Sequence, residues 1–151
     1  MTYEQILKDI NNKVYYPIYF LMGEEPFFID NISDELENKI LDEAERSFNQ
    51  IVLYGADVTA KDIMTQARAF PMMGERLVVI VKEAQSVKDI DNLSEYIEKL
   101  PPFCSILPLR AKGVPPDRWI LLWQRRAPFP TAKKETVKTK NVLTAFVISV
   151  Q

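Results

Sequence analysis

The sequence predicts an α/β domain built around a parallel, doubly wound sheet with flanking helices. Helical and extended patterns alternate in the order α-β-α-β-α-β-α through residue 100. Such alternation is typical of right-handed βαβ units in a parallel sheet. The strongest strand, residues 77–81, is a continuous aliphatic run, which indicates a strand covered on both faces. A chain of 151 residues suits one such domain.

The first two helices and the strand between them follow from caps and apolar spacing. A Thr-x-x-Gln capping box at residues 2–5 starts a short helix that ends near residue 11. A strand is predicted at 17–22, and the helix at 26–45 begins at Pro26, which suits a first helical turn. The side chains that this helix should bury are Ile29, Ile32, Leu36 and Ile40.

Two more capping boxes place the next helices. A strand at 48–54 precedes Thr59 and Asp62, which cap a helix to about residue 69. After the aliphatic strand, Ser86 and Asp89 are predicted to cap another helix. The apolar positions expected to face inward on these two helices are Ile63, Met64, Ala67, Ile90, Leu93, Ile97 and Leu100.

Beyond Pro102 the patterns weaken and the charge changes sign. Residues 1–100 carry 10 basic and 19 acidic side chains, whereas residues 101–151 carry 9 and 2. A strand at 104–109 is interrupted by Pro108, and a helix at 117–126 and a strand at 143–150 are weaker patterns. Two interpretations stay open for residues 103–151: an atypical continuation of the same domain, or an aberrant tail such as one read out of frame.

Composition excludes several function classes. The chain has no histidine, which removes the commonest general base and most zinc sites. Its single cysteine, Cys104, excludes an internal disulfide framework and fits a reducing cytoplasm. No apolar run approaches the roughly 20 residues of a membrane span, and the polar N-terminus does not resemble a signal peptide. We therefore expect a cytoplasmic protein with no membrane partner.

The first strand-turn-helix has the pattern of a nucleotide site without its chemistry. A phosphate-binding turn needs several glycines followed by lysine and Ser/Thr. Here the turn is Gly23-Glu24-Glu25-Pro26, in which two carboxylates would repel a triphosphate and the proline lacks an N–H donor. Lys82 follows the third strand, where an aspartate would hold Mg²⁺. The sequence predicts a degenerate nucleotide site, no catalytic residues and no cofactor.

An acidic cluster near the same turn is a weak metal candidate. Glu24, Glu25 and Asp30 carry the oxygen ligands that Mg²⁺ or Ca²⁺ prefers. Acidic side chains at a helix N-terminus also complement the helix dipole, and this explanation is the simpler one. No metal site is therefore predicted.

A short apolar segment precedes the third strand. It comprises Phe70, Pro71, Met72, Met73 and Gly74. Apolar residues between a proline and a glycine suggest an exposed loop tip, and methionine is common on binding surfaces. The alternative is that the two methionines plug the core, and composition alone favours this alternative.

Basic residues in the last third form a nucleic-acid candidate. Trp119 and Trp123 would supply stacking surfaces among cations that can contact phosphates. A solvated basic face or a non-native segment explains the same residues and is favoured. The cations are Lys112, Arg118, Arg125, Arg126, Lys133, Lys134, Lys138 and Lys140.

Three blocks in order resemble a known family. They are IYFLMGEEPFFIDNISDEL, FNQIVLYGADV and ARAFPMMGERLVVIVKEAQ. Together they resemble the N-terminal domain of the bacterial DNA polymerase III delta subunit, in a Bacteroidetes-like version. The resemblance covers residues 1–102. It implies an AAA+-like (P-loop-like) domain that does not bind nucleotide, and it implies that the family's helical lid and C-terminal oligomerisation domain are absent here.

The resemblance also implies a function in DNA replication. The family is a clamp-loader subunit that binds the ring-shaped sliding clamp (the beta subunit) and helps to open it, without hydrolysing ATP itself. Its apolar contact pair matches Met72 and Met73, flanked by Phe70, Pro71 and Gly74. This favours the exposed-loop interpretation, although the family usually has a leucine and an aromatic residue there.

The expected partners are the sliding clamp, the other clamp-loader subunits and, indirectly or weakly, DNA. The resemblance implies no small-molecule substrate and no catalytic site. It makes the chain a subunit of a DNA-directed DNA polymerase holoenzyme, a nucleotidyltransferase, by complex membership. The alternatives left open are a degenerate nucleotide-binding enzyme domain and a nucleic-acid-binding module that uses the basic tail.

Overall fold

The computed structural model describes residues 3–16, 18–23, 26–93, 104–109 and 143–148. Its α-helices are α1 (Tyr3–Asn11), α2 (Pro26–Lys39), α3 (Glu43–Asn49) and α4 (Ala60–Ala67). Its strands are β1 (Ile18–Gly23), β2 (Gln50–Tyr54), β3 (Leu77–Lys82), β4 (Cys104–Leu109) and β5 (Leu143–Ile148). Two 3₁₀ turns, η1 (Ala84–Ser86) and η2 (Ile90–Asn92), follow β3.

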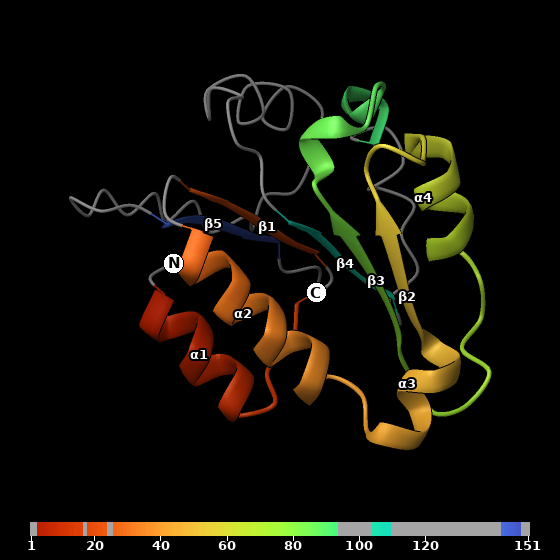
Figure 1. The fold of residues 1–151 in the computed structure, drawn as a ribbon. Coiled ribbons are helices and arrows are strands. Elements are labelled where there is room, and N and C mark those ends of the chain that lie inside the picture. The colour runs from red at the N-terminus through yellow and green to blue at the C-terminus, as the bar shows by residue number, and fades with distance from the viewer. Residues whose placement is uncertain (1–2, 17, 24–25, 94–103, 110–142, 149–151) are drawn as a thin grey trace.

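The described strands form one mixed sheet in the order β2-β3-β4-β1-β5 (Figure 1). Strands β2, β3, β4 and β1 run parallel to one another, as the alternating sequence pattern predicts. The register places Val79 beside Ile106, and Ile106 beside Ile18. Strand β5 pairs with β1 in the antiparallel direction, with Phe20 opposite Phe146. The sheet is therefore parallel except for one edge strand.

Strand β4 occupies the middle of the sheet, between β3 and β1. The prediction that Pro108 interrupts this strand is wrong, because the ladder continues from Cys104 to Leu109 and pairs Pro108 with Val81. Proline removes one N–H donor, but a strand with neighbours on both sides keeps its remaining ladder bonds.

Helices cover both faces of the sheet, and β3 contributes alternate side chains to each core. Leu77, Val79 and Val81 pack with α4 in one cluster. Val78 and Ile80 pack in a second cluster with α1 and α2. The continuous aliphatic run is thus buried on both faces, as predicted for a covered parallel strand.

The predicted inward stripes are confirmed for the positions that the structure describes. On α2 the fully buried side chains are Ile29, Ile32 and Leu36, and Ile40, directly after its last residue, is 8% exposed. On α4 and on the segment after β3 they are Ile63, Met64, Ala67, Ile90 and Leu93. Ile97, Leu100, Thr2 and the predicted helix at 117–126 lie outside the described residues.

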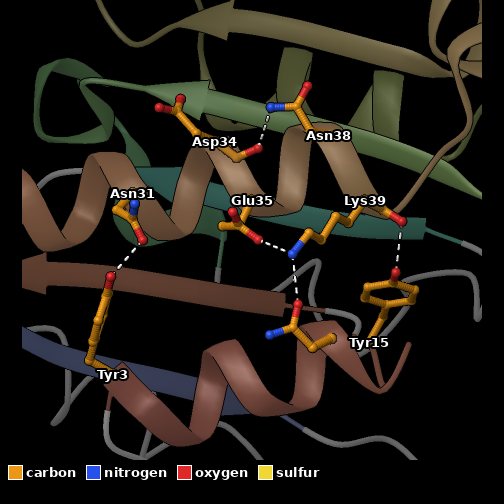
Figure 2. Close-up of polar contacts among 8 residues, drawn as sticks. Tyr3, Tyr15, Asn31, Asp34, Glu35, Asn38 and Lys39 are labelled. Carbon is orange, nitrogen blue, oxygen red and sulfur yellow. Dashed lines mark hydrogen bonds and ion pairs between the residues drawn. The ribbon is translucent and has the colours of Figure 1, made fainter.

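Polar contacts join α1 to α2 on their solvent side (Figure 2). The hydroxyl of Tyr3 donates to Asn31 Oδ1 at 2.6 Å. Lys39 Nζ donates to Asn11 Oδ1 at 2.7 Å, and the Lys39 carbonyl accepts from the hydroxyl of Tyr15 at 2.7 Å. Contacts so near the surface contribute little each, but together they hold the two helices side by side.

The helix predicted at 26–45 is wrong, because the structure has two helices there. α2 ends at Lys39, and Asp42 starts α3 with a capping box. Asp42 Oδ1 accepts from the Glu45 amide at 2.8 Å, and Glu45 Oε2 accepts from the Asp42 amide at 3.3 Å. This Asp-x-x-Glu signal ends the preceding helix. It also moves the start of the next strand from the predicted residue 48 to Gln50.

The caps near α4 differ from the prediction in one case. Thr59 and Asp62 form the predicted capping box. Ser86 and Asp89 do not cap a helix of their own: Ser86 is the last residue of η1, and η2 has no side-chain cap. Asp89 Oδ1 instead accepts the amide of Ala60 at 2.9 Å, at the start of α4. A carboxylate there satisfies a backbone donor that the helix leaves unpaired.

Candidate functional site

The apolar segment between α4 and β3 is an exposed loop. The side chains of Phe70, Met72 and Met73 are 81%, 78% and 47% exposed, and Pro71 is half-buried. The two methionines therefore do not plug the core, and the exposed-loop interpretation of the sequence is the correct one. Monomeric domains seldom present several large apolar side chains together without a binding role.

The side chain of Asn49, the last residue of α3, forms hydrogen bonds with the backbone of this loop. Asn49 Oδ1 accepts from the amides of Met72 at 2.8 Å and Met73 at 3.4 Å, and Asn49 Nδ2 donates to the Met73 carbonyl. Asn49 is fully buried although it is polar. Its hydrogen bonds offset the cost of burying an amide. The loop is thus exposed in its side chains and fixed in its backbone.

A second residue of α3 shapes the far end of the loop. Gly74 has φ of +70°, a conformation that favours glycine. A Cβ at this position would collide with the carboxylate of Glu45. Glu45 and Asn49 are four residues apart on α3, so they share one face of that helix. In Figure 1 the segment that joins α4 to β3 runs past α3 accordingly.

The loop leads into β3 through two charged residues. The guanidinium carbon of Arg76 lies 5.5 Å from the centroid of the Tyr15 ring, which is within the range of a cation–π contact. The neighbouring Glu75 is exposed. Arg76 therefore ties the end of the loop to the segment that precedes β1, and Glu75 is open to a partner.

The second candidate site, the strand-turn-helix, has the predicted frame. β1 ends at Gly23 and α2 begins at Pro26, while Glu24 and Glu25 lie outside the described residues. Lys82 at the end of β3 forms an ion pair with Glu37 of α2, at 3.3 Å. A paired lysine supplies no ligand for a cation, so the chemistry of this position disfavours Mg²⁺ binding.

Other sequence candidates receive no added support. No group of three or more metal-ligating side chains comes together among the described residues, and Asp30 is exposed on α2. The basic residues between 112 and 140, with Trp119 and Trp123, lie outside the described part of the chain. Where the structure describes helices, none is long and apolar enough to cross a membrane.

Asn49 is the site residue that the sequence interpretation missed. It had been placed inside a strand predicted at 48–54, where asparagine is an unfavourable residue. The low strand propensity of asparagine and the capping box at residues 42–45 together indicate a short helix that ends at Asn49. Its contact with a loop more than twenty positions later has no local signature.

Comparison with known proteins places this geometry in context. The model of the family described as "DNA polymerase III, delta subunit" matches residues 19–113, which is more than half of the chain and extends past Pro102. A Bacillus subtilis protein, DNA polymerase III subunit delta, is 27% identical over 77 residues, which are 51% of this chain and 22% of that protein.

Two solved structures have a similar fold. The Bacillus subtilis DNA clamp loader delta protein matches with a TM-score of 0.66 and 20% identity over 83% of this chain and 41% of its own. A Thermotoga maritima protein related to the DNA polymerase III gamma subunit matches with a TM-score of 0.53 and 18% identity, over 81% and 43% of the two chains. This chain thus spans less than half the length of each of these relatives.

Proposed function

Because this chain belongs to the DNA polymerase III delta-subunit family, we propose that it binds a sliding clamp through the loop Phe70–Gly74. In this proposal the chain helps to open the clamp during DNA replication and does not hydrolyse ATP itself. Its other partners are the remaining clamp-loader subunits, and it contacts DNA indirectly or weakly. Its place is in the cytoplasm, as part of a polymerase holoenzyme.

The observation that carries the proposal is the combination of exposed anchors and a fixed backbone. Phe70, Met72 and Met73 project apolar surface, while Asn49 holds the backbone of the two methionines. A rigid loop loses little conformational entropy on binding. Methionine side chains are flexible and polarizable, so they adapt to an apolar pocket.

The mechanism follows from burial of these anchors. Complete burial of a large apolar side chain contributes about 1.5–3 kcal/mol. Glu75 is exposed beside the anchors, and a rim charge of this kind mainly affects orientation and association rate. Clamp opening requires that the loop bind the open ring more tightly than the closed ring, since a ligand shifts an equilibrium only by its differential affinity.

We further propose that the α/β frame is an AAA+-like scaffold whose nucleotide site has lost its function. The turn from Gly23 to Pro26 joins β1 to α2, where a phosphate-binding loop would lie in a P-loop protein. Its two glutamates and its proline oppose phosphate binding, and Lys82 is paired with Glu37. On this view the frame serves to present the Phe70–Gly74 loop.

The test is a binding titration of this chain against the sliding clamp of the same organism, by surface plasmon resonance or calorimetry. We expect the double variant Met72→Ala with Met73→Ala to weaken binding about 30-fold or more, which corresponds to a loss of roughly 2 kcal/mol or more. Circular dichroism of the variant should match the wild type, since both side chains are exposed.

A matched control is Tyr54→Ala, which removes an exposed aromatic side chain from the edge strand β2. This variant should bind the clamp as the wild type does. Unchanged affinity of the double methionine variant would contradict the assignment of the loop. Equal losses in both variants would point to a nonspecific apolar effect and would also contradict it.

A further inference from the structure

We propose that Asn49 is the positioning residue of this loop: it holds the backbone of Met72 and Met73 in the shape that the partner binds. The inference rests on the proposed function and concerns how that function is prepared in the free protein. Asn49 itself is fully buried, so it acts through the loop and does not contact the partner.

The geometry assigns three backbone groups of two consecutive residues to one side chain. The Asn49 carbonyl oxygen accepts from the amides of Met72 and Met73, and its NH₂ group donates to the Met73 carbonyl. Only a side chain with a donor and an acceptor on one planar group makes all three bonds, so asparagine suits this position. Alanine would leave these groups of the loop without their protein partner.

These three hydrogen bonds lie outside the apolar core, so their loss should affect the loop more than the stability of the whole fold. Neither Met72 nor Met73 belongs to the two apolar core clusters of the described structure. The N-terminus of α3 is capped separately by Asp42, and its last residue, Asn49, makes the bonds to the loop. Removal of the Asn49 amide should therefore loosen the loop more than it unfolds the sheet, and the anchors would then lose conformational entropy on binding.

The principal test compares Asn49→Ala, Asn49→Asp and wild type in the clamp titration. We expect Asn49→Ala to weaken binding about tenfold, mainly through slower association. In only a small fraction of the variant molecules would the loop have the backbone conformation that the clamp binds. The control is Asn38→Ala, which removes an exposed asparagine whose NH₂ group donates to the Asp34 carbonyl and whose Oδ1 accepts from Arg46 of α3, neither of which belongs to the loop. It should leave clamp affinity unchanged.

Asn49→Asp tests the same three backbone contacts through pH, with circular dichroism at each pH to show that the variant stays folded. An ionised carboxylate still accepts both amides but repels the Met73 carbonyl, whereas a protonated carboxyl donates to it. The affinity of this variant relative to wild type should therefore recover as the pH is lowered through the pKa of the new carboxyl. The charged residues that precede Asn49 on the same turn of α3 and that follow the loop are Glu45, Arg46, Glu75 and Arg76. They are common to both proteins, so the ratio removes their effect.

Amide hydrogen exchange distinguishes failure of this inference from failure of the proposed function. If the wild-type protein does not bind the clamp, the proposed function fails. The role of Asn49 in holding the loop backbone is then tested by amide hydrogen exchange alone. Faster exchange at Met72 and Met73 in Asn49→Ala, with unchanged exchange in β3, supports it. Unchanged exchange there, or a relative affinity of Asn49→Asp that does not vary with pH, overturns it. If Asn49→Ala does not fold, Asn49→Asp decides the matter.

Discussion

Asn49 Oδ1 accepts a hydrogen bond from the amide of Met72 at 2.8 Å, although the two residues are 23 positions apart in the sequence. This contact joins the C-terminal end of α3 to the exposed loop before β3. Because Asn49 is fully buried, the bond is shielded from competing water. It explains how a loop with strongly exposed apolar side chains keeps a defined backbone.

The first prediction concerns the glycine at the end of the loop. Gly74→Ala should lower the free energy of unfolding by about 1–2 kcal/mol, because a left-handed conformation is costly for alanine. Its Cβ would also meet the Glu45 carboxylate. Urea unfolding measures the change. Glu45→Ala removes the collision but also a capping-box bond of α3, so the comparison is made against that single variant. In this background Gly74→Ala should still lower the free energy of unfolding by part of this amount, and no loss there would contradict the backbone explanation.

The second prediction concerns the cap that joins η2 to α4. Asp89→Ala should destabilise the fold by about 1 kcal/mol, because the Ala60 amide at the start of α4 loses its acceptor. Ser86→Ala is the matched control, since Ser86 is exposed and lies at the end of η1. It should change the free energy of unfolding by less than about 0.5 kcal/mol in the same urea titration. An equal effect of both changes would restore the capping role first predicted for Ser86.

The third prediction concerns alkaline pH and two tyrosines, Tyr16 before β1 and Tyr19 within it. Burial and a hydrogen bond to Asp9 raise the pKa of Tyr16 to about 12, and burial raises the pKa of Tyr19 further above 10. The hydroxyl of Tyr16 donates to Asp9 at 2.9 Å, and the hydroxyl of Tyr19 accepts the Tyr16 amide at 3.1 Å.

The sign of the pH effect follows from these raised values. Above pH 10 the unfolded chain releases tyrosine protons that the folded protein retains. The free energy of unfolding should thus be constant just below pH 10 and fall as the pH rises toward 12. Urea titrations at several pH values measure this fall, and Tyr16→Phe should make it shallower. A stability that rises above pH 10 would contradict the assignment.

The fourth prediction concerns nucleotides. Calorimetric titration of this chain with Mg-ATP should give no binding heat, because the turn after β1 carries two glutamates and a proline. Lys82, at the end of β3, is in an ion pair with Glu37. Measurable affinity for Mg-ATP would support the alternative of a degenerate but active nucleotide-binding domain, and Lys82→Ala would then show whether this end of the sheet takes part.

Much of the frame was predictable because its signals are local. The aliphatic run of β3, the Thr59–Asp62 capping box and the apolar stripe of α2 each depend on residues close in sequence. The break between α2 and α3 was equally local, since Asp42 and Glu45 form a capping box, but the apolar pattern continued across it and hid the boundary. Apolar periodicity alone does not mark the end of a helix.

The sequence by itself determined the alternation of helices and strands, the residues of the turn from Gly23 to Pro26 and the position of the apolar loop. Only the tertiary structure decided that Met72 and Met73 are exposed, that β4 lies centrally despite Pro108, and that Asn49 and Asp89 act on distant backbone amides. The physical reason is that caps and apolar periods act between neighbours in the chain. Exposure and long-range hydrogen bonds depend instead on which elements the folded sheet brings together.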